Sequence, residues 1–405
     1  MVFSKQLNDT RTLGHFPVTI TLNDRFAKKD SIDLICSTLQ EGVPLYFSGQ
    51  RCPVFDLGEG HYLRAKGWAY RRVDYNRWQK NEFEPKIPRT FGEDEPLEVR
   101  RGNISRPLPK RFMGGSGHYI GRQVDERGKL YQKMSEPRPH GAMVLERAKQ
   151  EHEIAQKVLD LEKVKTDIPV GHFTFDKFPF KYGGSNIPCG GYLCLSSTPY
   201  DIRSVEFLAY CENSELIKKL ELESLNFPRV IMAVGFSMGE TLRNLHNDRI
   251  THFCPHPDNF KILPRSAYDV SLVDLDNASV NNNPDQFLGR VLLDVETLMG
   301  YGILMFAQGD IYDLPEKNCV DFDNHLRYQR LLQDIRRKTQ ETKLEGLSAE
   351  YLLFSSLQLG YFGKDSPVLS AREIVDTPKI WFKSNKPISE VDNNFINLLR
   401  SIHNL

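Results

Sequence analysis

The sequence predicts an α+β protein, with strands concentrated before residue 200 and helices after it. Two observations support this class. Strand-like stretches recur at residues 43–47, 61–69 and 170–175, and the composition turns helical from residue 214 onward. The chain has 405 residues, of which 40% are hydrophobic and 26% are charged, an ordinary globular balance. That length suffices for two or three ordinary domains or for one two-lobed enzyme.

Charge and cysteine content narrow the classes of function. The net charge is zero, so no overall field attracts nucleic acid or an anionic membrane. The seven cysteines are scattered, odd in number and without CxxC spacing, which favours reduced thiols over a disulfide framework. The start lacks the apolar core of a Sec signal, and no run of about 18 apolar residues occurs. We therefore expect a cytoplasmic protein without a membrane span; secretion by a route that needs no Sec signal stays open.

Residues 1–100 are predicted to form an N-terminal extension of mixed structure. A helix is expected over residues 30–40, because its apolar side chains share one face. In the strand at 61–69, Lys66 lies among aromatic residues. A phosphate contact by this lysine is conceivable, but a strand with a solvated edge explains it better. Residues 71–98 are charged and contain several prolines, which is typical of a surface segment or linker.

A glycine-rich hairpin is predicted over residues 114–133. The sequence GGSG at 114–117 precedes two strand-like stretches that are joined by the turn DERG. A glycine loop can bring backbone N–H groups close to phosphates, although GGSG alone is more typical of a flexible turn. Lys133 ends a strand that is expected to be half buried, so its ammonium group needs an anionic partner.

A helix over residues 143–161 supplies a candidate for that partner. Glu151 falls in the middle of the apolar face of this helix. Glu146 and Glu153 point away from the apolar face and are expected in solvent. A carboxylate on the buried side of a helix needs a cation, so we expect Glu151 to be paired.

Residues 245–278 gather the polar groups of a candidate site. This stretch is predicted to run from a helix end, through a turn with two prolines, into two short strands. The turn and the end of the second strand carry side chains that suit a metal site: His252, Asn259, Asp274 and Asp276. A zinc site of Cys254 with nearby histidines, among them His246, is a weaker alternative, because a loop pattern explains His252 and His256 better.

Three further helices are predicted after this stretch, over residues 291–308, 327–342 and 393–402. The first is strongly apolar yet carries Asp294 and Glu296. It is expected to be the central buried helix of a helical region.

In this order, the features resemble the protein-kinase-like superfamily over roughly residues 110–310, about half of the chain. LHNDRITHFCPHPDNFKI resembles the kinase helix end and catalytic loop, of the form LH-x3-I-x-H-x-D-x4-N. VSLVDLDNA resembles the strand that ends in the metal-binding Asp, and LLDVETLMGYGILMFAQG resembles the central buried helix with its Asp. The loop with two prolines is most similar to aminoglycoside, choline and atypical ubiquinone-biosynthesis kinases.

The resemblance implies a two-lobed fold. Residues 1–100 would be an extension, 101–200 a small β-rich lobe and 201–405 a larger helical lobe. For the nucleotide, ATP, the resemblance implies that the glycine loop with Gly115 and Gly117 covers the phosphates. Lys133 would hold the phosphates and would pair with Glu151.

For the metal, the resemblance implies that Asn259 and Asp274 hold Mg²⁺. Asp294 would brace the backbone of the catalytic loop, and His252 would pack beneath the metal site. The short spacing between Asp274 and Asp294 leaves little room for a long activation segment.

The chain departs from the family at two site positions. Cys254 stands where the family has its catalytic Asp, and a thiol with an ordinary pKa near 8.5 is a poor substitute for an ionised carboxylate. Asp276 stands where the family has glycine, and its carboxylate is able to bind metal or act as a base. His256, Asp258 and Asp276 are therefore the candidates to assist catalysis.

Two functions remain open on this evidence. The first is an ATP- and Mg²⁺-dependent transferase that moves a phosphoryl group to an unidentified protein or small-molecule acceptor. AMP transfer, as in selenoprotein-O-type pseudokinases, is a less favoured variant of it. The second is an inactive pseudokinase that binds nucleotide and recruits a partner. An unrelated α+β protein is the remaining alternative.

Overall fold

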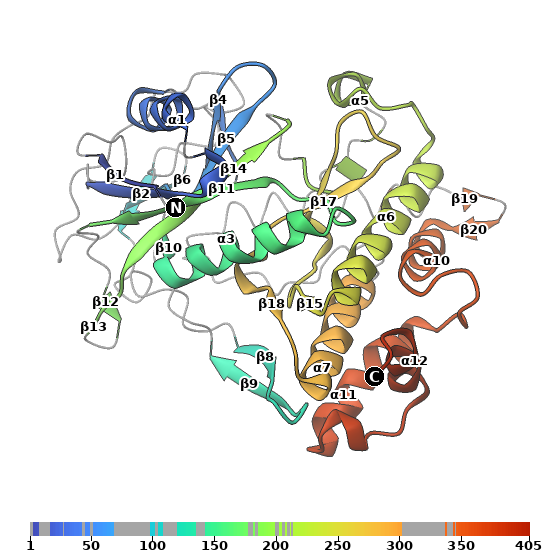
Figure 1. Cartoon of the computed structure of the whole chain (residues 1–405). Coiled ribbons are helices and arrows are strands. Elements are labelled where there is room, and N and C mark those ends of the chain that lie inside the picture. The colour runs from blue at the N-terminus through green and yellow to red at the C-terminus, as the bar shows by residue number, and fades with distance from the viewer. Residues whose placement is uncertain are drawn as a thin grey trace. The chain divides into compact units, whose positions relative to one another are not determined.

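The computed structural model confirms the α+β class and divides the chain into two compact units (Figure 1). The first comprises Met1–Ile120, Met134–Lys157 and Asp167–Tyr200, and the second comprises Gly121–Lys133, Val158–Thr166 and Asp201–Leu405. The residues described are 3–7, 17–26, 28–42, 45–48, 52–68, 98–101, 104–107, 120–134, 142–176, 181–182, 185–198, 202–204, 207–208, 211, 214–301, 337, 343–344 and 346–405. No helix in this part of the chain is long and apolar enough to cross a membrane.

An 8-stranded antiparallel sheet forms the centre of the first unit. Its strand order is β1-β2-β11-β14-β5-β4-β3, and β10 pairs with β14. The strands are β1 (Phe3–Leu7), β2 (Val18–Leu22), β3 (Tyr46–Ser48), β4 (Cys52–Asp56), β5 (Tyr62–Lys66), β10 (Met143–Val144), β11 (Ile168–Phe175) and β14 (Cys189–Ser196). Strands from residues 3–66, which were expected in an extension, therefore share this sheet with β11 and β14.

One face of the sheet carries the apolar core. Ala65 of β5 lies opposite Leu193 of β14, and this row and its neighbours pack against α1 (Lys29–Glu41). The predicted helix over residues 30–40 is thus confirmed, with Ile32 and Leu39 buried. Since successive side chains of a strand point to opposite faces, the alternate residues of β5 and β14 must lie on the other face.

That other face is polar and is covered by α3 (Leu145–Asp160). It carries Arg64 and Lys66 of β5, which lie opposite Cys194 and Tyr192 of β14. Helix α3 reaches it through a Glu151 ion pair and through aromatic contacts. The expectation of a solvated edge at Lys66 was wrong, because β5 lies inside the sheet between β14 and β4.

Helices dominate the second unit. They are α5 (Ser214–Leu220), α6 (Phe227–Asn247), α7 (Pro284–Val295), α10 (Ala349–Phe362), α11 (Ala371–Ser384) and α12 (Asn394–Ile402). The side chain of Asn226 caps α6 and Asn283 caps α7, and each helix has proline in its first turn. Helix α7 continues into a π-helical segment, Glu296–Tyr301. The prediction over 393–402 is confirmed by α12, while residues 302–308 and most of 327–342 lie outside the described residues.

The predicted hairpin is confirmed as β8 (Ile120–Val124) and β9 (Leu130–Met134). Its turn places Gly128 at a φ of 67°, a conformation that favours glycine. Within the second unit, the hairpin packs at the start of α7, where Gln286 Nε2 donates to Val124 O at 3.2 Å. It also contacts the short helix η7 (Ile388–Glu390), where Ile388 N donates to Gly128 O at 3.1 Å. The preceding loop, with Gly115 and Gly117, lies outside the described residues.

Helix α6 packs closely along α10 (Figure 1). Glycines bring the two backbones together: a Cβ atom added at Gly239 would lie 2.3 Å from Leu357 O. On an exposed helix, Gly→Ala stabilises by up to about 1 kcal/mol. At Gly239 the backbone contact outweighs this gain, because overpacking costs about 1–3 kcal/mol.

We therefore predict that Gly239→Ala lowers the free energy of unfolding by about 1–2 kcal/mol in urea denaturation. Glu240→Ala, at the exposed neighbouring position of α6, should change it by less than about 0.5 kcal/mol. A stabilising Gly239→Ala substitution would show that α6 and α10 are not in close backbone contact.

Candidate functional site

In the first unit, β5 and α3 bring Lys66 and Glu151 together. Lys66 Nζ lies 3.0 Å from Glu151 Oε1 and 2.8 Å from Oε2. The lysine side chain is 14% exposed and the glutamate side chain 4% exposed. The expectation that Glu151 is buried and paired is confirmed. Lys66 makes an ion pair with it. The expected pair with Lys133 stays a prediction, because the Lys133 side chain lies outside the described residues.

Lys133 lies in β9 of the hairpin. Its side chain is not among those that the structure describes. The sequence did contain a signal for Lys66, because Arg64 and Lys66 alternate with the buried apolar Leu63 and Ala65. Two cations at every second position of a buried strand indicate that its second face is polar and covered.

A second ion pair lies on the same face. Arg64 Nη1 is 2.8 Å from Asp167 Oδ2, with side chains only 7% and 10% exposed. Cys194 Sγ lies 4.0 Å from the same carboxylate oxygen. Burial raises the pKa of Tyr192 well above its ordinary value, and the charges of Glu151 and Asp167 act in the same direction. This face therefore holds charged groups in a dry environment, where their interactions are strong.

In the second unit, two short strands bring the predicted metal ligands together. β16 (Phe260–Ile262) pairs with β17 (Val270–Leu272), and Phe260 lies opposite Leu272. The pairing extends by one bond, because Val273 N donates to Asn259 O at 3.0 Å. Asn259 and Asp274 therefore lie at adjoining ends of one hairpin, although a loop separates them in the sequence.

The side chain of Asn259 is oriented for an acceptor role. Its Nδ2 donates to Cys254 O at 2.8 Å, and this carbonyl accepts only from the NH₂ end of the amide. Asn259 Oδ1 is thereby directed away from the loop backbone. An amide oxygen of this kind is a suitable ligand for Mg²⁺.

Asp274 and Asp276 complete an oxygen-rich group. Asp274 has left-handed backbone angles, φ 65° and ψ 49°, and it precedes the short helix η5 (Leu275–Asn277). One carboxylate oxygen of Asp274 and one of Asp276 lie within 4.8 Å of each other. Asp276 also accepts from Asn277 Nδ2 at 2.8 Å. Hard oxygen donors fit Mg²⁺, whereas zinc favours sulfur and imidazole ligands.

His252 connects the loop to the strand that leads to Asp274, because its ring contacts the backbone oxygen of Val273. Its Nδ1 accepts from Cys254 N at 3.3 Å, so Nε2 carries the proton and donates to Val273 O at 3.0 Å. Both ring nitrogens are therefore used by the backbone. His252 is buried, and in this geometry neither ring nitrogen is free to bind zinc.

Asp294, on α7, braces the loop from below. Its Oδ2 accepts the backbone N–H of His252 at 2.7 Å and lies 3.1 Å from His246 Nε2. Burial raises the pKa of Asp294 to about 7, against the opposing effect of the loop amides. Phe253, beside this anchor, has a positive φ of 75°. Such strain persists only where the surrounding contacts fix the backbone.

The residues that the resemblance makes candidates for a catalytic base differ in burial and charge. Cys254 is partly exposed and holds the loop through its backbone. His256 is buried, and burial lowers the pKa of its imidazole to about 4, so it is neutral at pH 7 and a weak base. The side chain of Asp258 lies outside the described residues. Asp276 is the described carboxylate beside Asp274.

Comparison with known proteins gives little guidance. No family model matches the chain, and no curated protein matches it. Among solved structures, the chain is similar to "WaaP in complex with acyl carrier protein", with 15% sequence identity and a TM-score of 0.27 over 53% of this chain and 76% of that one. A TM-score this low does not establish a shared fold.

We predict that Lys66→Met destabilises the protein, because it leaves the Glu151 carboxylate buried without its cation. Removing one partner of a buried pair lowers the free energy of unfolding by about 3–5 kcal/mol. Urea denaturation should show this loss, and Lys66→Met/Glu151→Leu should recover most of it. A loss equally large in the double variant would show that the ion pair is not its cause.

The buried His256 predicts a loss of stability in acid. The folded protein keeps its imidazole neutral down to about pH 4, whereas the unfolded chain protonates it below about pH 6.5. This contribution is fully present above pH 6.5 and is lost as the pH falls, by about 2 kcal/mol at pH 5. His256→Gln should lose correspondingly less stability between pH 7 and pH 5 in urea denaturation. An unchanged pH dependence would contradict the assignment.

Proposed function

We propose that the protein is a kinase-like transferase that binds ATP with Mg²⁺ and moves a phosphoryl group to a protein or small-molecule acceptor. The observation that carries this proposal is the β16–β17 hairpin. It sets Asn259 and Asp274 side by side, with Asn259 Oδ1 directed away from the loop. These are the two positions that, by resemblance, hold the metal.

Lys66 replaces Lys133 as the proposed phosphate-binding lysine. Lys66 Nζ lies within hydrogen-bond distance of both carboxylate oxygens of Glu151. The pair also fixes the direction of the lysine side chain. An ammonium held in this way is able to neutralise charge on phosphate oxygens.

The metal would supply most of the charge neutralisation during transfer. Asn259 and Asp274 would hold it, and Asp276, whose carboxylate lies close to that of Asp274, would add a ligand or accept the acceptor's proton. Loss of a positioned base costs about 10²–10⁴-fold in rate. Phosphoryl transfer depends mainly on positioning and electrostatics, so Cys254 slows the reaction without abolishing it.

A pseudokinase is the second candidate function, and the chemistry of the loop favours it. Cys254 offers a thiol, and the neighbouring His256 is buried and neutral. Under this alternative the protein binds nucleotide but transfers nothing. AMP transfer is a third outcome, distinguished by which phosphate of ATP is moved.

Thermal shift with ATP and Mg²⁺ tests nucleotide binding directly. We expect the wild-type melting temperature to rise at millimolar ATP, because a ligand that binds only the folded state stabilises it. Asp274→Ala should abolish the part of the melting-temperature shift that depends on Mg²⁺. Lys66→Ala should weaken the apparent affinity for ATP, obtained from the shift at several ATP concentrations, at least tenfold, which is a loss of about 1.4 kcal/mol of binding free energy. Lys133→Ala is the matched control and should retain the shift. Loss of binding in Lys133→Ala but not in Lys66→Ala would reverse the assignment.

Transfer is tested with ATP labelled at the γ- or the α-phosphate. Label from the γ-position on an acceptor supports phosphoryl transfer, and label from the α-position supports AMP transfer. Cys254→Asp restores the family's carboxylate and should raise the rate about 10²-fold or more. If neither the wild type nor Cys254→Asp transfers label although both bind ATP, the pseudokinase is favoured.

A further inference from the structure

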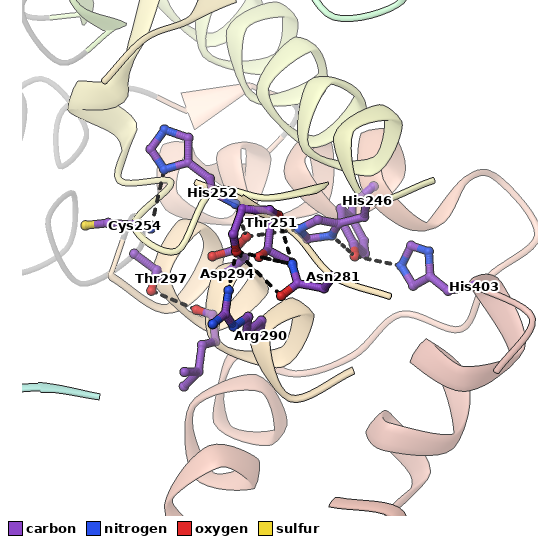
Figure 2. A network of polar contacts seen from close by, with 12 residues as sticks. His246, Thr251, His252, Cys254, Asn281, Arg290, Asp294, Thr297 and His403 are labelled. Carbon is purple, nitrogen blue, oxygen red and sulfur yellow. Dashed lines mark hydrogen bonds and ion pairs between the residues drawn. The ribbon is translucent and has the colours of Figure 1, made fainter. Parts of the chain in front are cut away.

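A chain of buried hydrogen bonds joins helices α10 and α12 to the loop at His252. His403, at the end of α12, places Nε2 3.0 Å from the hydroxyl of Tyr361 on α10. The same hydroxyl lies 2.6 Å from Nδ1 of His246 on α6. Nε2 of His246 then lies 3.1 Å from Asp294 Oδ2. Figure 2 shows the line of contacts from His403 through His246 to Asp294.

The direction of each hydrogen bond follows from the groups present. The ionised Asp294 carboxylate has no proton to donate, so His246 Nε2 donates to its Oδ2, which also accepts from His252 N. Burial lowers the pKa of His246 to about 3, so its imidazole is neutral and Nδ1 accepts from Tyr361. The hydroxyl of Tyr361 has one proton, so its oxygen must accept from His403 Nε2.

The remaining ring nitrogen of His403 fits this direction. Its Nδ1 is buried and has no hydrogen-bond partner among the described residues. Burial lowers the pKa of this imidazole to about 3 as well. In a neutral ring with its proton on Nε2, Nδ1 carries no proton. Burying an unpartnered acceptor nitrogen costs less free energy than burying an unpartnered N–H donor.

We propose that Tyr361 and His403 are positioning residues that hold the loop at residues 251–259 in place through His246 and Asp294. Among the hydrogen bonds described, Asp294 connects this chain to the loop: its Oδ2 accepts the backbone N–H of His252 and also contacts the ring of His246. Tyr361 and His403 lie outside the stretch that resembles kinases. The helices α10 and α12 therefore act on the loop, beyond packing against α6 and α7.

Hydrogen exchange tests the proposal without nucleotide, so its failure is distinguishable from failure of the proposed function. Tyr361→Phe removes one hydroxyl and keeps the ring. We expect a peptide spanning residues 249–262 to exchange about fivefold faster, the equivalent of one lost hydrogen bond. Tyr268→Phe is the matched control: it removes the hydroxyl of another buried tyrosine of the same unit, which donates to Glu223 O.

The two control comparisons decide the outcome. Equal exchange of this peptide in Tyr361→Phe and Tyr268→Phe would overturn the proposal, because Tyr361 would then act by packing alone. If Tyr361→Phe does not fold, His403 decides instead. His403→Gln keeps a donor near the Nε2 position and should match the wild type, whereas His403→Leu should exchange about fivefold faster. Identical behaviour of Gln and Leu at this position would overturn the proposal.

Discussion

The carboxylate of Asp294 is the contact on which the second unit's candidate site depends. It is fully buried, and it accepts the backbone N–H of His252. A buried carboxylate is stable only with several donors around it, so Asp294 fixes the loop and the loop in turn stabilises Asp294. His252 passes this constraint to Val273, the residue before Asp274. A site built from a few oxygen ligands binds metal well only if those ligands are held in position before the metal binds. Asp294 would hold the loop that carries the proposed ligands in this way.

The first unit uses the same principle with a different pair. Glu151 is buried on the helix face that its sequence pattern predicted, and Lys66 holds it in a fixed direction. The periodicity of a helix shows which side chain lies inside, and burial of a charge shows that a cation must be near. Neither shows which cation. Lys66 precedes Glu151 by 85 residues, and the pairing exists only because β5 lies inside the sheet, between β14 and β4. Lys133, closer in sequence, was the candidate that the local pattern offered, and its side chain lies outside the described residues.

The same limit explains which other parts were predictable. Short-range patterns predict the hairpin β8–β9, the helix α1 and the loop residues Asn259 and Asp274. The structure contains the hairpin, and the apolar faces of α1 and α3 are buried as expected. No local sequence pattern indicates the role of Tyr361 or His403. Tyr361 lies 115 residues from its partner His246, and His403 lies 42 residues from Tyr361. A long-range hydrogen bond between buried side chains is set by helix packing, which a single sequence does not specify.

The metal site is the central claim, and direct observation of a bound ion tests it best. Crystals grown with ATP and Mn²⁺, which replaces Mg²⁺ and scatters anomalously, would locate the ion without reference to activity. We expect an anomalous peak about 2.1 Å from Asn259 Oδ1 and from a carboxylate oxygen of Asp274. A bound nucleotide whose metal lies on other residues, with Asn259 and Asp274 uncoordinated, would contradict the account.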